Sequence, residues 1–210
     1  MSQGLFQAIR KGDRSGVISL LDREPAAAQA VDDQGVSAVM VALYYHQFEL
    51  AELVASRKRE LTFLEVCALG RIDAARGFLQ GSPGLIDELS PDGFSALHLA
   101  AFFGRTDLVQ WLVEQGASVN SPAGNPSRVT PLHSAVAGRT SEVVEMLVEA
   151  GADLNARQHG GYTPLMGAAV AGQKGLVDFL LAHGADPGAR SDEGKTARDL
   201  ATEKGFPGVI

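Results

Sequence analysis

The chain has few of the features that mark secreted, membrane or disulfide-stapled proteins. Cys67 is its only cysteine, so an intrachain disulfide is excluded. No apolar run approaches the roughly 20 residues that cross a bilayer. The first residues, 1–6, lack the basic-then-apolar form of a secretory signal. These absences predict a cytoplasmic protein that does not insert into a membrane.

Basic residues are also outnumbered, and the formal net charge is −7. Non-specific nucleic-acid binding usually requires a basic face, so we expect no nucleic acid among the partners. Hydrophobic residues make up 45% of the chain, which is enough for a continuous core. The composition therefore favours a folded protein whose partners are other proteins.

The most informative feature is a repeated pattern. The segment TPLH at 130–133 recurs as TPLM at 163–166, 33 residues later, and SALH at 95–98 stands one repeat earlier. A second apolar helical run follows each segment and ends at a glycine, namely Gly116, Gly151 and Gly184. A fixed period near 33 residues, with two helices in each repeat, is typical of a solenoid.

Each recurring residue type has a physical role in such a repeat. Serine or threonine before a helix can cap its free N–H groups, as expected for Ser95, Thr130, Thr163 and Thr196. Pro131 and Pro164 fit the first helical position, where no hydrogen-bond donor is lost. A terminal glycine adopts the left-handed conformation at low cost. One such repeat cannot bury its own apolar face, but a stack of them can.

These residues resemble ankyrin repeats. The resemblance implies an all-α solenoid of about seven stacked helix-turn-helix repeats joined by hairpin-like loops. We expect one ankyrin-repeat domain over 1–210. Its expected parts are a degenerate N-terminal cap repeat at 1–34, two irregular repeats at 35–91, three regular repeats at 92–193 and a C-terminal cap at 194–210. A second helix is expected to begin where the sequence ends, so a longer natural chain is left open.

No grouping of residues predicts catalysis, a cofactor or a metal. None of the five histidines has the i, i+4 spacing of a helical zinc site. By the resemblance, His98 and His133 occupy a structural position where the ring hydrogen-bonds near a hairpin. Cys67 lies on an apolar helical face and is expected to be buried. The basic cluster at 57–59 is interpreted as a solvated helix end.

The resemblance implies that a partner protein binds the hairpin tips and the exposed side of the first helices. In the first four repeats these positions are unusually apolar and aromatic, which is typical of an interaction surface. The predicted partner-binding residues are Tyr44, Tyr45, Leu69, Phe94, Phe102, Phe103 and Tyr162. The alternative for each first-helix pair is that one member packs in the core. Trp111, on a second helix, is expected in the core.

The sequence thus predicts a monomeric, non-catalytic module that binds a partner protein on its concave and hairpin surface. Two alternatives remain open at this point. One is a regulatory or targeting module of a larger enzyme, or an inhibitor of an enzyme or toxin. The other is a protein that associates with itself through the aromatic patch. Fold alone does not choose among them.

Overall fold

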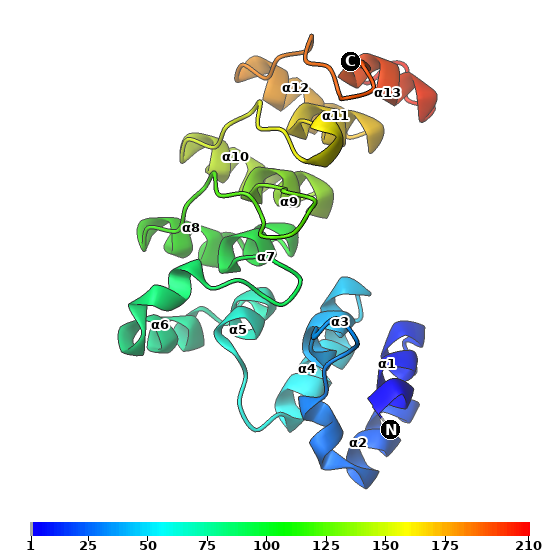
Figure 1. Cartoon of the computed structure of the whole chain (residues 1–210), viewed down its shortest axis with the longest axis vertical. Coiled ribbons are helices and arrows are strands. Elements are labelled where there is room, and N and C mark those ends of the chain that lie inside the picture. The colour runs from blue at the N-terminus through cyan, green and yellow to red at the C-terminus, as the bar shows by residue number, and fades with distance from the viewer. Residues whose placement is uncertain (1) are drawn as a thin grey trace. The chain divides into compact units, whose positions relative to one another are not determined.

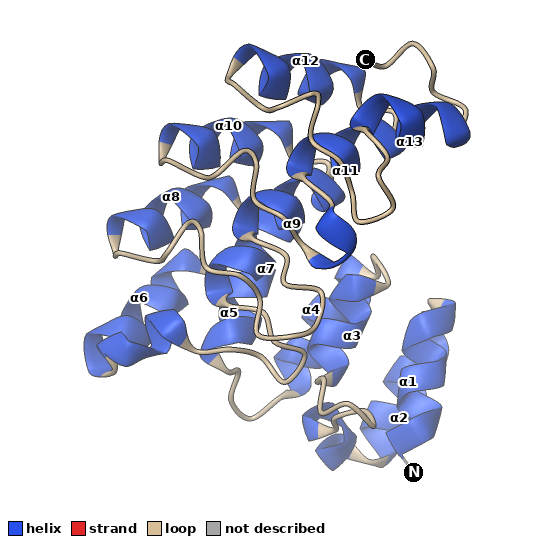
Figure 2. Cartoon of the chain, turned by 45° about the horizontal axis from the view of Figure 1, so that its top comes forward, coloured by secondary structure: helices blue, strands red, loops and turns tan. Residues whose placement is uncertain are grey.

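The computed structural model describes residues 2–210, and every regular element in that range is a helix (Figure 2). Thirteen α-helices and three short 3-10 helices alternate with loops in this described part. The predicted all-α fold class is therefore confirmed. The chain divides into two compact units, residues 1–93 and 94–210, which we call unit 1 and unit 2. The single domain expected over 1–210 stays a prediction.

Unit 1 consists of three antiparallel helix pairs (Figure 1). The pairs are α1 (Ser2–Lys11) with α2 (Arg14–Arg23), α3 (Ala38–Tyr44) with α4 (Phe48–Arg57), and α5 (Phe63–Leu69) with α6 (Ile72–Gly81). The 3-10 helices η1 (Pro25–Gln29) and η2 (Pro83–Asp87) follow α2 and α6. Helix α3 packs on both α1 and α5. Leu5, Ile9, Leu21, Leu43 and Phe63 fill the interior of these pairs.

Unit 2 repeats the same arrangement more regularly (Figure 1). Its pairs are α7 (Ala96–Phe102) with α8 (Thr106–Glu114), α9 (Pro131–Gly138) with α10 (Ser141–Glu149), and α11 (Pro164–Val170) with α12 (Lys174–Ala182). The 3-10 turn η3 (His159–Gly161) lies in the hairpin before α11, and α13 (Ala197–Glu203) closes the row. The first helices α7, α9, α11 and α13 pack in succession.

The residues expected to begin and end the helices do so. Pro131 and Pro164 are the first residues of α9 and α11. The hydroxyl of Thr196 accepts a hydrogen bond from the Asp199 N–H at 3.2 Å, and that of Ser95 caps α7 in the same way. Gly116, after α8, has a φ of 92°, which glycine adopts without a steric penalty. Local sequence therefore sets the helix boundaries of unit 2.

The core of unit 2 depends on small residues between closely packed first helices. Leu97, Leu132 and Leu165 are at most 1% exposed. A Cβ atom placed on Gly138 would lie 2.0 Å from the carbonyl oxygen of Phe102, so only glycine lets α9 approach α7 this closely. Trp111 is 7% exposed, which confirms its expected place in the core.

The interpretation of the basic cluster at 57–59 as a solvated helix end is wrong for its central residue. Only residues 58–62 join α4 to α5, so no hairpin separates these helices. In this short connection the Lys58 side chain turns inward, is 7% exposed, and forms an ion pair of 2.7 Å with Glu65. The preceding Arg57 is exposed and pairs with Asp22 at 2.7 Å.

Candidate functional site

A groove of about 450 Å³ opens in unit 2 over the first helices α7, α9 and α11. Two hairpin segments, 127–129 and residue 158, also contribute to its wall. The side chains that reach it from the helices are mainly small or apolar. They include Phe102, Val136, Ala137, Pro164, Val170 and Ala171. Its size lies within the range of about 300–1,000 Å³ usual for binding sites.

Small residues make this groove possible. Ala137 is exposed near the end of α9 and presents only a methyl group. Gly167 in α11 has no side chain, and a Cβ atom there would lie 3.3 Å from Cγ1 of Val136. Ala171 follows α11 directly. Because these positions lack bulk, the space over α9 and α11 stays open.

Two of the predicted partner-binding aromatics, Phe94 and Phe102, line this groove. Both are half-buried. The Phe102 ring meets the Phe103 ring edge-on, with centroids 5.1 Å apart and planes at 83°, a favourable aromatic geometry. Phe103 is half-buried too but is not among the groove-lining residues. The structure therefore brings Phe94, Phe102 and Phe103 together within unit 2.

Arg139 is the charged residue of the groove wall. Its backbone has a φ of 58°, a left-handed conformation uncommon outside glycine. The guanidinium Nη2 donates to the Ala171 carbonyl oxygen at 3.4 Å. Gln173 Nε2 similarly donates to the Val136 carbonyl at 3.1 Å. The wall thus combines apolar contact area with a few fixed polar groups.

His98 and His133 join each first helix to the next hairpin, as the resemblance implied. The Nε2–H of His98 donates to the Val129 carbonyl at 2.9 Å, and that of His133 donates to the Tyr162 carbonyl at 3.2 Å. Each Nδ1 therefore accepts, from the Ser95 hydroxyl at 2.7 Å and from Thr130 at 2.9–3.2 Å. Burial lowers the pKa of both rings, and the pKa of His133 falls to about 4. Both are neutral structural groups.

The remaining predicted residues have different surroundings. Tyr45 is 49% exposed, and the Arg10 guanidinium lies 5.8 Å from its ring centroid. Tyr44 is half-buried, and its hydroxyl donates to Asp92 Oδ2 at 2.7 Å. Tyr162 is half-buried in the hairpin before α11. Leu69 is only 8% exposed, so its expected place on the surface is wrong. Its neighbour Ala68 is buried as well, so neither member of this pair is exposed.

Sequence reasoning missed a buried polar network in unit 1. Glu65 is 2% exposed and occupies the position in α5 that His133 holds in α9. Its carboxylate accepts from Lys58 Nζ at 2.7 and 3.0 Å, from the Ser37 hydroxyl at 2.5 Å and from the Thr62 N–H at 2.9 Å. The available signal was the capping-box spacing of Thr62 and Glu65.

Cys67, as expected, is fully buried in α5. Burial, assisted by the negative charge of Glu88, raises the pKa of its thiol to about 12. A thiol with this pKa remains protonated at neutral pH and is a poor nucleophile. Within residues 2–210 no group of three or more histidine, cysteine, aspartate or glutamate side chains is placed to hold a metal ion.

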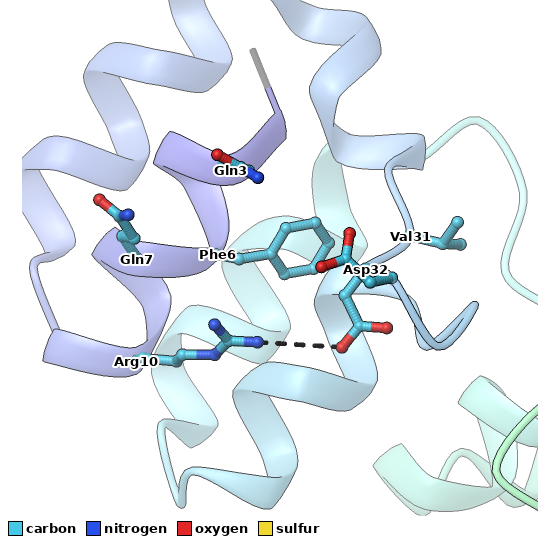
Figure 3. A pocket seen from close by; sticks show the side chains of 7 residues that line it. Gln3, Phe6, Gln7, Arg10, Val31 and Asp32 are labelled. Carbon is cyan, nitrogen blue, oxygen red and sulfur yellow. Dashed lines mark ion pairs between the residues drawn. The ribbon is translucent and has the colours of Figure 1, made fainter.

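Unit 1 contains two smaller hollows that share Val31. The first, of about 220 Å³, lies between α1 and the segment 31–33, where the Arg10 guanidinium reaches toward Asp32 at 3.9 Å beside the Phe6 ring (Figure 3). The second, of about 370 Å³, lies between the hairpin around Val31 and the segment 88–92. Its wall includes Lys58 and Glu65.

The repeated helix pairs, the histidine bonds to successive hairpins and the small-residue groove all agree with the comparison to known families. Residues 63–158 and 124–191 match the family described as ankyrin repeats (3 copies). Together the two matched ranges cover more than half of the 210 residues. The chain belongs to the ankyrin-repeat family. Ankyrin repeats are generally protein–protein interaction modules and are typically non-catalytic. Among the described residues of this ankyrin-repeat chain, no helix has the length and apolar character needed to span a bilayer.

Proposed function

We propose that the chain is a non-catalytic module that binds a partner protein in the groove of unit 2. The observation that supports this most directly is the groove itself, in which Phe94 and Phe102 stand beside small residues of α9 and α11. Half-buried aromatic side chains are frequent anchors of protein interfaces. The seven predicted contact residues remain part of the proposal only where they reach the surface, which removes Leu69.

The mechanism proposed is docking to a surface that exists before the partner arrives. The wall of the groove belongs to packed helices, and the hairpins beside it are tied together by backbone bonds such as His159 N–H to the Ser127 carbonyl at 2.8 Å. A rigid surface loses little conformational freedom on association, so more of the contact energy remains as affinity. The partner would place an apolar side chain against Phe102 and polar groups near Arg139 and Gln173.

The proposal includes a monomer in a reducing compartment such as the cytoplasm. A single, buried cysteine is consistent with a compartment where disulfides are rare. The net charge of −7 opposes close contact between two copies.

The test is affinity capture from a lysate of the host cells, with the wild type and an Ala137→Glu variant. Ala137 is exposed on α9, so glutamate would occupy the groove and leave the core unchanged. Ala182→Glu, at the exposed end of α12, is the matched control. We expect Ala137→Glu to lower partner binding at least tenfold while the circular dichroism spectrum stays that of the wild type.

A partner that binds Ala137→Glu as tightly as Ala182→Glu would overturn the proposal. Loss of binding in both variants would also contradict it, because the effect would then follow the added charge and not the groove.

A further inference from the structure

The acidic residues of unit 2 lie outside the segments that form its groove. No aspartate or glutamate occurs in residues 94–106, 115–141 or 154–177, and these three stretches contain every residue that lines the groove. Carboxylates are frequent on the second helices instead, where α10 alone carries Glu142, Glu145 and Glu149. A chain with a net charge of −7 therefore builds its groove without an acidic side chain.

The charge that the groove does carry is positive and has no counter-ion. Arg139 is exposed on the wall, where its guanidinium donates to the Ala171 carbonyl at 3.4 Å. Within residues 2–210 it takes part in no ion pair. The next carboxylate along the sequence, that of Glu142, accepts from the Thr106 hydroxyl of the preceding repeat at 3.3 Å. Because a guanidinium has five N–H donors, Arg139 retains donors for a ligand.

A second arginine stands at the hairpin edge of the groove. Arg128 is exposed between Ser127 and Val129, which both line the groove. Like Arg139, it forms no ion pair with the described residues. The arginine of the next hairpin differs, because Arg157 pairs with Asp192 at 3.0 Å. The local charge at the groove is thus opposite to that of the whole chain, which favours a ligand of negative charge.

The groove discriminates among possible occupants by both charge and polarity. A basic segment would bring like charge to Arg139, and a wholly apolar segment would cover the guanidinium without a counter-ion. A carboxylate, by contrast, can accept two parallel hydrogen bonds from a guanidinium. Ala137 is exposed and Val170 is half-buried in the same groove, so both offer apolar contact area. An occupant that carries a carboxylate and aliphatic groups together satisfies both features.

We propose that the groove of unit 2 binds a segment of the partner protein in which an aspartate or glutamate stands next to aliphatic side chains. The carboxylate engages Arg139, and the aliphatic side chains lie over Ala137 and Val170. The volume of about 450 Å³ accommodates side chains of this size. This inference rests on the proposed function, since it names the class of segment that occupies the same groove.

A second copy of the chain is a poor source of such a segment. Its acidic second helices carry aliphatic residues, but Val143, Val144 and Leu147 of α10 are each 0% exposed in its own core. They are therefore not available to a neighbouring groove. The occupant we propose belongs to a different protein.

The test titrates a short fluorescein-labelled peptide, with glutamates between leucines, against the full chain at low and high salt. Three matched peptides carry glutamine for glutamate, lysine for glutamate, or serine for leucine. Four variants are compared with the wild type after circular dichroism has shown that they are helical. Arg139→Gln removes the charge, Arg139→Glu reverses it, and Ala137→Gln adds bulk without charge. Arg198→Gln, at an exposed arginine of α13, is the matched control.

We expect saturable binding that weakens as salt rises. Arg139→Gln and Ala137→Gln should each weaken it at least fivefold, whereas Arg198→Gln should change it less than twofold. The wild type should bind the lysine peptide at least tenfold more weakly than the glutamate peptide. Arg139→Glu should reverse that preference, a result that damage to the fold would not produce.

The proposal is overturned by the absence of saturable binding, by equal effects of Arg139→Gln and Arg198→Gln, or by unchanged binding to Ala137→Gln. Equal affinity for the glutamine peptide or for the serine peptide would also overturn it, because carboxylate and aliphatic groups would then not both be needed.

The captured cellular partner separates this inference from the proposed function. If Ala137→Glu loses the partner while Arg139→Gln and Arg198→Gln bind it equally, the groove remains the binding site and the acidic class of segment is wrong. If Ala137→Glu binds the partner as tightly as Ala182→Glu, the proposed function itself fails.

Discussion

At the scale of single residues, the same slot of the repeat performs opposite tasks in the two units. In unit 2, His133 reaches forward and donates to the Tyr162 carbonyl of the following hairpin. In unit 1, Glu65 reaches back to Ser37 and Lys58 in the preceding repeat. A histidine can bridge to a carbonyl because it carries an N–H, whereas a carboxylate requires donors. In these two repeats, therefore, the residue at this position bonds to opposite neighbours.

We predict that Glu65→Ala lowers the free energy of unfolding by about 3–5 kcal/mol, because it leaves the buried Lys58 ammonium without its partner. Chemical denaturation measures this change. Glu60→Ala, at an exposed position of the same connection, should change stability by no more than about 0.5 kcal/mol. If the two substitutions lower the free energy of unfolding equally, the Glu65 network does not stabilise the fold.

The histidines predict a dependence of stability on pH. The folded pKa of His133 is about 4, below the usual 6.5 of an unfolded histidine. The unfolded chain therefore binds an additional proton between these values. The full stability contribution is present above about pH 6.5 and is lost as the pH falls toward 4, to a total of about 3 kcal/mol. The lowered pKa of His98 acts in the same direction.

Urea denaturation of the wild type and His133→Gln from pH 7 to pH 4 isolates this effect. We expect the variant to lose less stability over that range than the wild type. If the stability of the wild type and that of the variant fell in parallel with pH, the His133 ring would not be buried in its neutral form.

Many of the single-residue features could be predicted from the sequence. The helix caps, the glycines that end helices and the histidine position all depend on local or repeated patterns. The position of Lys58 could not be predicted. Three consecutive basic residues at a helix end usually face water, and only the shortness of the connection 58–62 places one beside Glu65.

At the scale of helices, close contact between first helices requires residues without side chains. Gly138 is the clearest case, because its Cα faces the Phe102 carbonyl of α7. We predict that Gly138→Ala destabilises the chain by about 1–3 kcal/mol through overpacking. Gly175→Ala, in α12, has no atom within 4 Å of the added carbon and should stabilise by about 0.4–1 kcal/mol. Thermal denaturation compares them, and a tolerated Gly138→Ala would contradict the close approach of α7 and α9.

The helices and their pairing follow from the apolar periodicity, yet the orientation of first-helix side chains does not. Each repeat offers two adjacent apolar residues near the end of its first helix, and the helix can turn either toward its core. Tyr45 is exposed while Tyr44 is half-buried, and Leu69 is buried. The pattern of a single repeat therefore does not say which of the two side chains is buried.

At the scale of the whole molecule, the family follows from the 33-residue period, whereas the binding surfaces depend on side chains from several repeats. The groove of unit 2 combines residues from three repeats, and the second hollow of unit 1 combines two hairpin segments with the connection 58–62. The sequence predicted Phe94 and Phe102 as contact residues. It did not predict the second hollow of unit 1, because Val31, Glu88 and Leu89 lie outside the repeated motif.

Hydrogen exchange of the captured complex, read by mass spectrometry, tests the central claim most directly. We predict slower exchange on partner binding in residues 127–139 and 158–173, which line the groove, and no change in α8, α10 and α12. Slower exchange confined to α8, α10 and α12, or to unit 1, would contradict the proposal that the partner occupies the groove of unit 2.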